Sequence, residues 1–540
     1  MEKSNKKWVI IMPIVLAIML VTGIYIGNGL RVENKDSRFF IYPQTNKLNS
    51  LLNYIEEEYV DSISKNKLIE DAIPIILEDL DPHSVYIAAK DLQETNETLE
   101  GNFDGIGIEF NILHDTVIVI NTISGGPSEK IGLLAGDRIV TVDDSLIAGI
   151  GLTTRDVISL LKGPGGSKVV VGILRKNEAE IIDYEIIRGK IPMFSVDVAY
   201  MIADSIGYLK ISRFSKNTYE EFLTGIKKLK VANMTKLILD LRGNGGGFLD
   251  IAVSIVNEFL DAGKLIVYHE GKARPKRESF STSEGICIND NVYVLMDEQS
   301  ASASEILAGA LQDNDRGTII GRRSFGKGLV QEQTQFPDGS ALRLTVARYY
   351  TPTGRCIQKP YSNGKFDYYH EVIDRFNIGD FSDADSIQTN DSLKYFTPKG
   401  KVVYGGGGIV PDIFVPVDTT GISTYFTKVR NRGYIYTYAF DYADENRETF
   451  SNFNNYIELH EHLKKQNLLN KFIKYAENKG IKPNHADIRY SKELLATLLY
   501  AQVVRNIFDD EGFYPIIHEI DATLLKAIEV SRQFSIGSQQ

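Results

Sequence analysis

The feature that most constrains the fold is an alternation of strand and helix patterns between residues 206 and about 330. Short apolar runs alternate there with segments whose apolar residues recur at helical spacing. Such alternation is typical of a largely parallel sheet with helices on its faces, so we predict an α/β domain. The expected strands are Ile206–Ile211, Lys236–Leu241, Val292–Met296 and Gly317–Gly321, and the expected helices are Tyr219–Leu229, Phe248–Leu260 and Ala303–Leu311.

Three loops of this domain are expected to meet at one edge of the sheet. A glycine-rich loop, Arg242–Gly247, follows one strand, Ser302 follows the next, and Lys327 follows the third. Loops after parallel strands emerge at the carboxyl edge, where open α/β sheets build their sites. Ser302 and Glu305 also form a capping-box pattern, which needs no chemistry. The convergence of the three loops favours the functional interpretation of Ser302.

The residues in these loops suit acyl transfer. A serine hydroxyl needs a base to become a nucleophile, and no histidine lies near Ser302 in the sequence. Lys327 can serve as the base if burial keeps it neutral, and the amide of Gln331 can orient its amine. Backbone amides of Gly246, Gly247 and Ala303 can form an oxyanion hole. Taken singly, Lys327 would instead be read as an exposed loop lysine.

A β-rich module of about 100 residues precedes this domain. Its loop Gly105-Ile106-Gly107-Ile108 and its turn Leu134–Ile139 resemble those of a PDZ domain, with a second helix at the matching place. The resemblance implies that the amides of the loop bind a peptide's C-terminal carboxylate while the peptide adds a strand to the sheet. A passive spacer is the alternative. Its expected strands are Ile106–Phe110, Val117–Ile120, Arg138–Val142 and Val169–Ile173, and its expected helices are Pro127–Leu134 and Thr154–Leu161.

The N-terminus reads as an uncleaved signal anchor. Lys3, Lys6 and Lys7 precede a run from Trp8 to Gly27 that carries no charge and is long enough to span a bilayer. We therefore predict a single-pass protein of the inner membrane, held through residues 8–27, with the catalytic part on the periplasmic, extracytoplasmic side. A cleaved signal peptide is the alternative.

Composition excludes several classes of function. The net charge of −11 and the pI of about 5.4 argue against a nucleic-acid partner. Cys287 and Cys356 are the only cysteines, too few for a disulfide framework, and whether they pair is open. The one histidine cluster, His460 with His462, has a spacing that favours a solvated helix over a metal site. No metal or cofactor is predicted.

The remaining segments complete the expected domain organisation. Residues 30–45 look like a polar tether, Leu48–Leu80 shows two helical patterns, and 361–400 looks like a polar insertion or long loop. Beyond about 425 the pattern is helical, and its apolar faces can pack on the core or on a second subunit. The predicted domains are 1–29, a cytoplasmic stub and transmembrane anchor; 30–91, a tether and helical segment; 92–188, a PDZ domain; 189–424, a serine protease core; and 425–540, a helical C-terminal region.

Four segments together resemble the signatures of the carboxyl-terminal processing proteases, also called tail-specific proteases. They occur in that family's order, behind a PDZ-like module, and the resemblance covers roughly residues 40 to 420. The segments are Asp240–Gly247, Ser300–Glu305, Gly326–Gln331 and Ala347–Arg355.

The resemblance implies a serine endopeptidase on a crotonase-like core that selects substrates by apolar C-terminal tails and needs no cofactor. It makes Ser302 the nucleophile, Lys327 the base and Gln331 its support, with Gly246, Gly247 and Ala303 around the oxyanion. A homodimer and an activating partner stay open. The alternative is a catalytically silent PDZ scaffold that binds C-termini of exported proteins. Acyl-thioester chemistry is disfavoured because the chain is predicted to be exported and has no evident nucleotide-binding motif.

Overall fold

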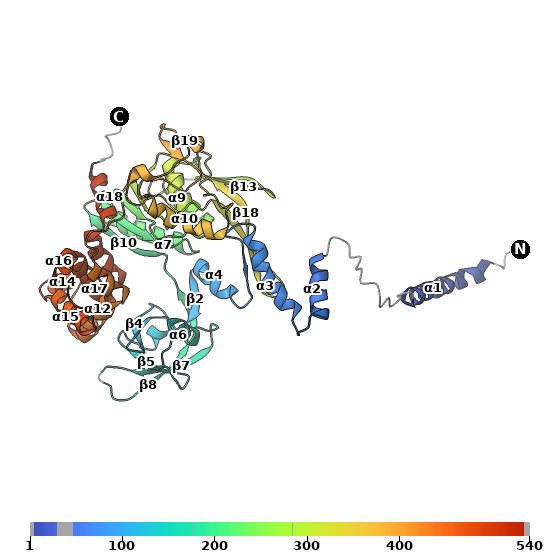
Figure 1. Ribbon diagram of the computed structural model, residues 1–540, viewed down its shortest axis with the longest axis horizontal. Helices are drawn as coiled ribbons and strands as arrows, with labels where there is room; N and C mark the ends of the chain where they lie inside the picture. The colour runs from blue at the N-terminus through green and yellow to red at the C-terminus, as the bar shows by residue number, and fades with distance from the viewer. Residues whose placement is uncertain (1–4, 30–46, 177, 283–284, 534–540) are drawn as a thin grey trace. The chain divides into compact units, whose positions relative to one another are not determined.

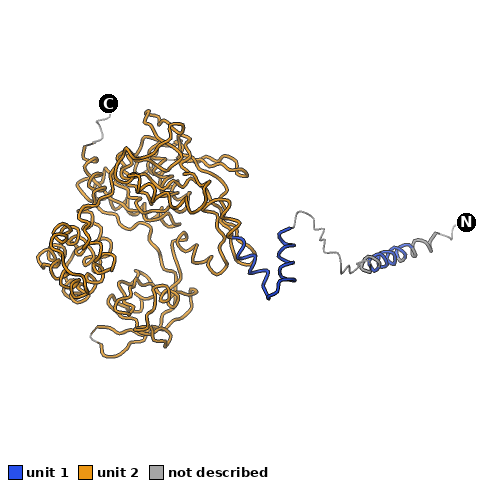
Figure 2. Tube along the Cα trace, viewed as in Figure 1, with its two compact units in different colours: residues 1–73 blue, residues 74–540 orange. Residues whose placement is uncertain are grey.

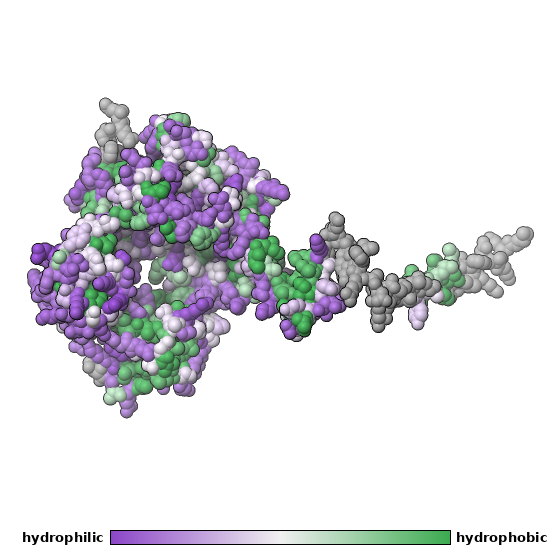
Figure 3. Space-filling model, in the orientation of Figure 1, coloured by the Kyte–Doolittle hydropathy of each residue, from purple (hydrophilic) through white to green (hydrophobic). Residues whose placement is uncertain are grey.

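The computed structural model describes residues 5–29, 47–176, 178–282 and 285–533, so the tether predicted for residues 30–45 lies outside it. The chain divides into two compact units, Met1–Ile73 and Pro74–Gln540 (Figure 2). The first unit holds α1 (Asn5–Gly29), α2 (Lys47–Glu58) and the start of α3 (Lys65–Glu78). Apolar side chains are exposed on α2 and α3, among them Leu48, Leu51 and Ile75 (Figure 3).

Helix α1 contains residues 8–27, for which the sequence predicts a membrane anchor. Among the described residues, no helix combines the length and the apolar character needed to cross a membrane. The side chains of residues 8–11, 14 and 26–27 lie outside the described part.

The central sheet of the second unit has the predicted alternation (Figure 1). Every strand and helix predicted between residues 206 and 321 is present, with ends shifted by a few residues at most. The sheet is parallel apart from its first strand, β10, which is antiparallel to β11. In spatial order the strands are β10 (Val196–Ala203), β11 (Ile206–Ile211), β12 (Lys236–Asp240), β15 (Asn291–Met296), β16 (Gly317–Gly321) and β21 (Ile413–Phe414), and the helices between them are α7 (Thr218–Val231), α8 (Leu249–Asn257) and α9 (Ala303–Asp313).

Both faces of this sheet are buried, because successive side chains of a strand point to opposite faces. Leu237 and Leu239 of β12 are fully buried in the same core cluster as α7, α8 and α9. Ile238, between them, belongs to a second cluster together with Leu524 of α18 (Ala522–Gln533). The sequence left open what the C-terminal helices cover, and α18 packs on the core sheet.

A second, antiparallel sheet carries the segment that follows Lys327. Its strands are β1 (Val85–Ile87), β18 (Ala341–Tyr350), β13 (Leu265–Gly271) and β14 (Arg274–Phe280), with β17 (Leu329–Gln335) also paired to β18. Strand β18 extends the predicted strand Ala341–Ala347. The β13–β14 hairpin was not predicted, because β14 is highly charged and almost wholly exposed and so lacks an apolar pattern.

The module before the core has the predicted β-rich organisation with its two helices. The chain enters and leaves it through β2 (Asn102–Gly105) and β9 (Gly189–Pro192), which pair antiparallel, and α4 (Leu92–Glu100) lies just before β2. Val119, Ile139 and Val157 are fully buried in its core. The strands are β3 (Ile108–Leu113), β4 (Thr116–Thr122), β5 (Arg138–Val142), β6 (Ser145–Leu146), β7 (Lys168–Leu174) and β8 (Ile182–Ile187), and the helices are α5 (Pro127–Lys130) and α6 (Thr154–Leu161).

The C-terminal region is helical, as predicted, and most of it forms its own core. His460 corrects the expectation of a solvated histidine cluster, because it is only 5% exposed and its ring lies beside that of Tyr500. The helices are α11 (Thr424–Asn431), α12 (Tyr434–Glu445), α13 (Arg447–Phe450), α14 (Tyr456–Lys464), α15 (Leu468–Asn478), α16 (His485–Tyr490) and α17 (Lys492–Ile517), followed by the short η4 (His518–Ile520) before α18.

The polar segment at 361–400 is more ordered than a long loop. It forms helix α10, which buries Tyr368 and Arg375 against the core. Helix α10 buries Tyr368 and Arg375 but leaves Phe366 and Phe376 exposed, so its apolar positions do not mark its buried face. Cys287 and Cys356 are both free thiols. The elements here are α10 (Lys365–Asn377), η2 (Ala384–Ser386), η3 (Asp391–Leu393), β19 (Lys394–Phe396) and β20 (Val402–Tyr404).

Candidate active site

Ser302 lies between β15 and α9, at the predicted edge of the sheet. Its φ of +55° is unusual for a residue other than glycine, and such strain persists only where the surroundings impose it. The neighbouring serines are bound to the glycine-rich loop and to the residue before it: the Ser304 hydroxyl donates to the Asn244 carbonyl at 2.9 Å, and the Ser300 hydroxyl donates to the Leu241 carbonyl at 2.8 Å. Of the three serines, Ser302 lines the cavity described below.

Glu305, fully buried in the first turn of α9, joins the backbones of Ser302 and Lys327. One carboxylate oxygen accepts the amides of Ser302 at 2.8 Å and Lys327 at 2.9 Å. The other accepts the Gly326 amide at 2.7 Å and the Ser324 hydroxyl at 2.5 Å. Burial raises the pKa of Glu305 to about 7, although these donors favour its charged form. Glu305, the glutamate of the predicted capping box, thus also fixes the backbone of Gly326 and Lys327.

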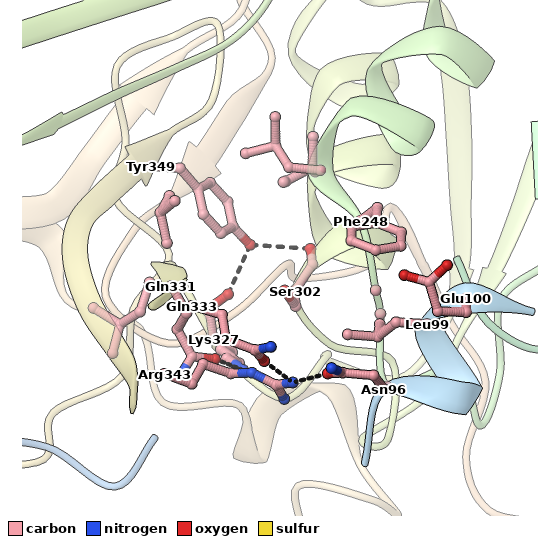
Figure 4. Close-up of a pocket in the computed structure, with 17 residues that line it drawn as sticks. Asn96, Leu99, Glu100, Phe248, Ser302, Lys327, Gln331, Gln333, Arg343 and Tyr349 are labelled. Atoms are coloured by element: carbon pink, nitrogen blue, oxygen red, sulfur yellow. Dashed lines mark hydrogen bonds between the residues drawn. The ribbon is translucent and has the colours of Figure 1, made fainter. Parts of the chain in front are cut away.

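Tyr349 joins the same two residues from their carbonyl side. Its hydroxyl lies 3.1 Å from the Ser302 carbonyl oxygen and 2.8 Å from that of Lys327 (Figure 4). Burial raises the pKa of Tyr349 well above its ordinary value, which keeps the hydroxyl protonated and able to donate. Glu305 and Tyr349 were assigned no role in positioning from the sequence, although both stand in the segments that carry the family resemblance.

Lys327 is held as predicted by Gln331. The lysine Nζ donates to Gln331 Oε1 at 2.9 Å, and the Gln331 amide nitrogen donates in turn to the carbonyl of His83. Burial lowers the pKa of Lys327, and the positive charge of Arg343 lowers it further. Asp81 fixes the turn that contains His83 by accepting its amide at 2.8 Å. The sequence identified this turn but not its role behind Gln331.

The glycine-rich loop lies directly against Ser302. A Cβ placed on Gly246 would come 2.7 Å from Ser302 Cβ and 3.0 Å from the amide nitrogen of Ala303. The Gly246 amide itself donates to Asn244 Oδ1 at 2.8 Å. For the amides of Gly247 and Ala303, the described part of the chain offers no acceptor. Two of the three predicted amides therefore remain available to a ligand.

Ser302 and Lys327 line one cavity of about 510 Å³ (Figure 4). Apolar side chains of the core and Arg343 complete its wall, and Asn96 of α4 reaches it next to the β-rich module. Arg343 donates to Gln333 at 2.9 Å and to Asn96 at 3.4 Å. The lining also includes Leu99, Phe248, Leu249, Ile306, Leu329 and Val330.

The predicted peptide-binding loop is not part of this cavity. Ile106 is buried in the core of the module, its carbonyl accepting the Ser128 amide at 3.0 Å. Gly107 has a φ of +78°, and a Cβ there would lie 2.9 Å from Ile191 Cδ1, so the loop depends on glycine. The loop joins Gly105 at the end of β2 to Ile108 at the start of β3, an edge strand of its sheet.

Comparisons with known proteins agree with this architecture. A model described as Peptidase family S41 matches residues 205–363, a PDZ domain model matches 105–186, and a family of unknown function (DUF8443) matches 425–509. The photosystem II D1 C-terminal processing protease is a solved structure 26% identical to this chain, covering 68% of it and 92% of that protein, with a TM-score of 0.35.

Curated relatives extend over most of the same region. The carboxy-terminal-processing protease of Bartonella bacilliformis is 35% identical over 350 residues, covering 63% of this chain and 80% of the relative. The carboxy-terminal processing protease CtpA of Bacillus subtilis is 31% identical over 365 residues, covering 66% and 76%. This chain is therefore a serine peptidase with a PDZ domain, and it belongs to the family of carboxy-terminal processing proteases.

Proposed function

We propose that this chain is a serine endopeptidase that cleaves exported proteins recognised through apolar C-terminal tails, using Ser302 as nucleophile and Lys327 as general base. The observation that carries the proposal is the shared cavity of these residues. Within it, a lysine whose pKa is lowered by burial is oriented by Gln331 and tied to the serine through Glu305 and Tyr349.

The proposed mechanism follows from this arrangement. Neutral Lys327 takes the hydroxyl proton as Ser302 Oγ attacks the scissile carbonyl, and the amides of Gly247 and Ala303 receive the oxyanion. The lysine then gives the proton to the leaving amine, which departs and leaves an acyl-enzyme. Water, deprotonated by the same lysine, releases the acyl group and restores Ser302. The central parallel sheet and its helices support the assignment of a crotonase-like core to this part of the chain.

Tail recognition is assigned to the PDZ domain. The Gly105–Ile108 loop can receive the terminal carboxylate, and the open edge of β3 can pair with the tail as an added strand, beside α6. We propose that tail binding also moves the domain and so gates the cavity, because α4, which lines the cavity through Asn96 and Leu99, leads directly into β2.

The test is cleavage of an unstructured reporter that ends in an apolar tail. We expect residues 30–540 to cleave it, and cleavage to fall about tenfold when the tail's carboxylate is amidated, as expected for loss of a charge-assisted anchor. Deleting residues 92–188 should remove the preference for the free carboxylate and change basal cleavage. Unchanged basal cleavage and tail preference in the deletion would refute gating, and tail binding without turnover would favour the silent scaffold.

We further propose that residues 8–27 hold the protein at the inner membrane with the protease on the periplasmic side. The support is the sequence, in which an uncharged run follows Lys3, Lys6 and Lys7. We expect the full chain to stay with membranes in alkaline carbonate and deletion of residues 1–29 to release it. A soluble mature protein whose N-terminus lies beyond residue 27 would identify a cleaved signal peptide instead.

A further inference from the structure

The side chain of Arg242 connects the glycine-rich loop to the C-terminal end of the chain. Its Nε and Nη2 donate to the carboxylate of Asp240, at 3.0 Å and 2.6 Å. Its Nη1 and Nη2 donate to the two carboxylate oxygens of Asp521, at 2.9 Å and 2.7 Å. Paired bonds between guanidinium and carboxylate fix direction as well as distance. Arg242 is thus clamped between β12 and the segment before α18.

The Asp240 side of the clamp is rigid. Asp240 is 1% exposed, and its carboxylate also accepts the Tyr208 hydroxyl at 2.7 Å. Burial opposes the charge of Asp240, but Arg242 and Lys210 outweigh it, so the pKa of Asp240 lies below its ordinary value. Lys210 Nζ also donates to the Arg242 carbonyl at 3.0 Å. The start of the loop is therefore fixed by buried charges.

The Asp521 side is anchored independently of Arg242. Asp521 Oδ1 accepts the Leu524 amide at 3.0 Å, as an N-cap of α18 does. His518, just before it, pairs with the Tyr200 hydroxyl at 2.6 Å through Nδ1. Leu524 and Ala527 of α18 are fully buried against the central sheet. Asp521 consequently stands on a rigid support outside the S41 match.

Between Arg242 and Ser302 the glycine-rich loop is fixed by hydrogen bonds at successive residues. The Gly243 amide donates to Asp297 Oδ1 at 3.0 Å, and the Asn244 side-chain amide donates to the Ile211 carbonyl at 2.9 Å. The Gly246–Gly247 turn then lies against Ser302. A change at Arg242 is therefore expected to move the amide of Gly247 relative to the serine.

We propose that Asp521 is a positioning residue for catalysis: through Arg242 it holds the glycine-rich loop so that the Gly247 amide faces the oxyanion formed at Ser302. This gives the C-terminal segment a role in the chemistry although it touches no substrate. The inference rests on the proposed Ser302 mechanism and adds a residue to it.

The test compares Asp521→Asn with Asp521→Ala in residues 30–540. Asparagine keeps an N-cap acceptor for α18 but loses the charge that binds Arg242, whereas alanine loses both. We expect Asp521→Asn to lower kcat about tenfold, with KM within twofold of the parent, because a displaced oxyanion donor acts in the transition state; complete loss of such a donor costs about 100-fold or more. Asp521→Glu, which keeps the charge, should recover part of that kcat.

Glu529→Gln, an exposed substitution on the same helix, is the matched control and should keep the parent's kcat. The proposal is overturned if Asp521→Asn keeps kcat within twofold, or if its loss is explained by unfolding at the assay temperature in a thermal melt. It is likewise overturned if KM alone changes. A parent that does not cleave the reporter, or a Ser302→Ala form that does, would instead contradict the proposed function.

Discussion

Replacing Ser302 or Lys327 by alanine should lower cleavage of the tailed reporter by about 10⁴-fold or more, because members of a catalytic unit fail together. Ser302→Ala removes the attacking oxygen. Lys327→Ala removes the only amine held in the cavity by Gln331, and in the described structure no other lysine lines that cavity. The double variant should be no less active than either single variant.

The measurement is the rate of reporter cleavage by residues 30–540, with folding followed by thermal melts. Lys276→Ala, on the exposed β14 and outside the cavity, should match the parent. Ser300→Ala and Ser304→Ala should weaken cleavage without abolishing it, because the Ser300 hydroxyl bonds Leu241 and Asp297 and the Ser304 hydroxyl bonds Asn244, all outside the proposed chemistry. Cleavage that survived in Ser302→Ala and was lost in a neighbour would assign the nucleophile elsewhere.

The same assay has an expected pH dependence. A general base must be neutral, so kcat/KM should rise with pH through the pKa of Lys327. Burial places that pKa below the ordinary value of lysine, so the rise should be complete at lower pH than for an exposed lysine. Arg343→Gln should shift the rise toward higher pH, because the positive charge that helps to lower the lysine's pKa is gone.

Gly246→Ala should lower kcat by about 100-fold, comparable to losing an oxyanion donor. The φ of Gly246 is +103°, and an alanine Cβ would come 2.7 Å from Ser302 Cβ and 2.8 Å from the Ala301 carbonyl oxygen. Moving the backbone of Ala301 or the strained Ser302 would cost considerable free energy, so we expect the loop itself to move away from Ser302.

Gly245→Ala provides the comparison, because a Cβ there meets no atom within 4 Å and its φ is not positive. We expect a much smaller loss in that variant. The rate at which an active-site-directed phosphonate labels Ser302 would distinguish the two variants. We expect this labelling to be slowed in Gly246→Ala and little changed in Gly245→Ala. Equal rates in both would mean that the close approach of Gly246 has no catalytic role.

The central sheet and the convergence of its loops could be predicted from sequence because each rests on a local pattern. Buried strands contain short apolar runs, such as Leu237–Leu239 and Val292–Met296, and the carboxyl-edge rule then brings Arg242–Gly247, Ser302 and Lys327 together. The predicted bond between Lys327 and Gln331 is confirmed by the structure. Roles for the predicted residues beyond this bond stay predictions.

What the sequence could not provide depends on contacts between distant segments. The Asn244 side chain accepts a hydrogen bond from the Gly246 amide, and the spacing of the glycines does not reveal this bond. Tyr349 reaches Ser302 only because β18 pairs with β17, and the bonds of His83 and Asp521 join residues more than 200 positions apart. Hydrogen bonds of this kind produce no periodic pattern in the sequence, because each one depends on a single polar side chain at a single position.

The position of α18 on the central sheet has a consequence for the making of the protein. The sheet and the loop with Ser302 are synthesised long before residues 522–533, which bury the second face of that sheet. Until those residues emerge, Ile238 and its neighbours lack their helix and Arg242 lacks Asp521. A nascent or truncated chain that stops before Asp521 would thus carry Ser302 without the Arg242–Asp521 pair, and we expect it to cleave the reporter more slowly than the parent.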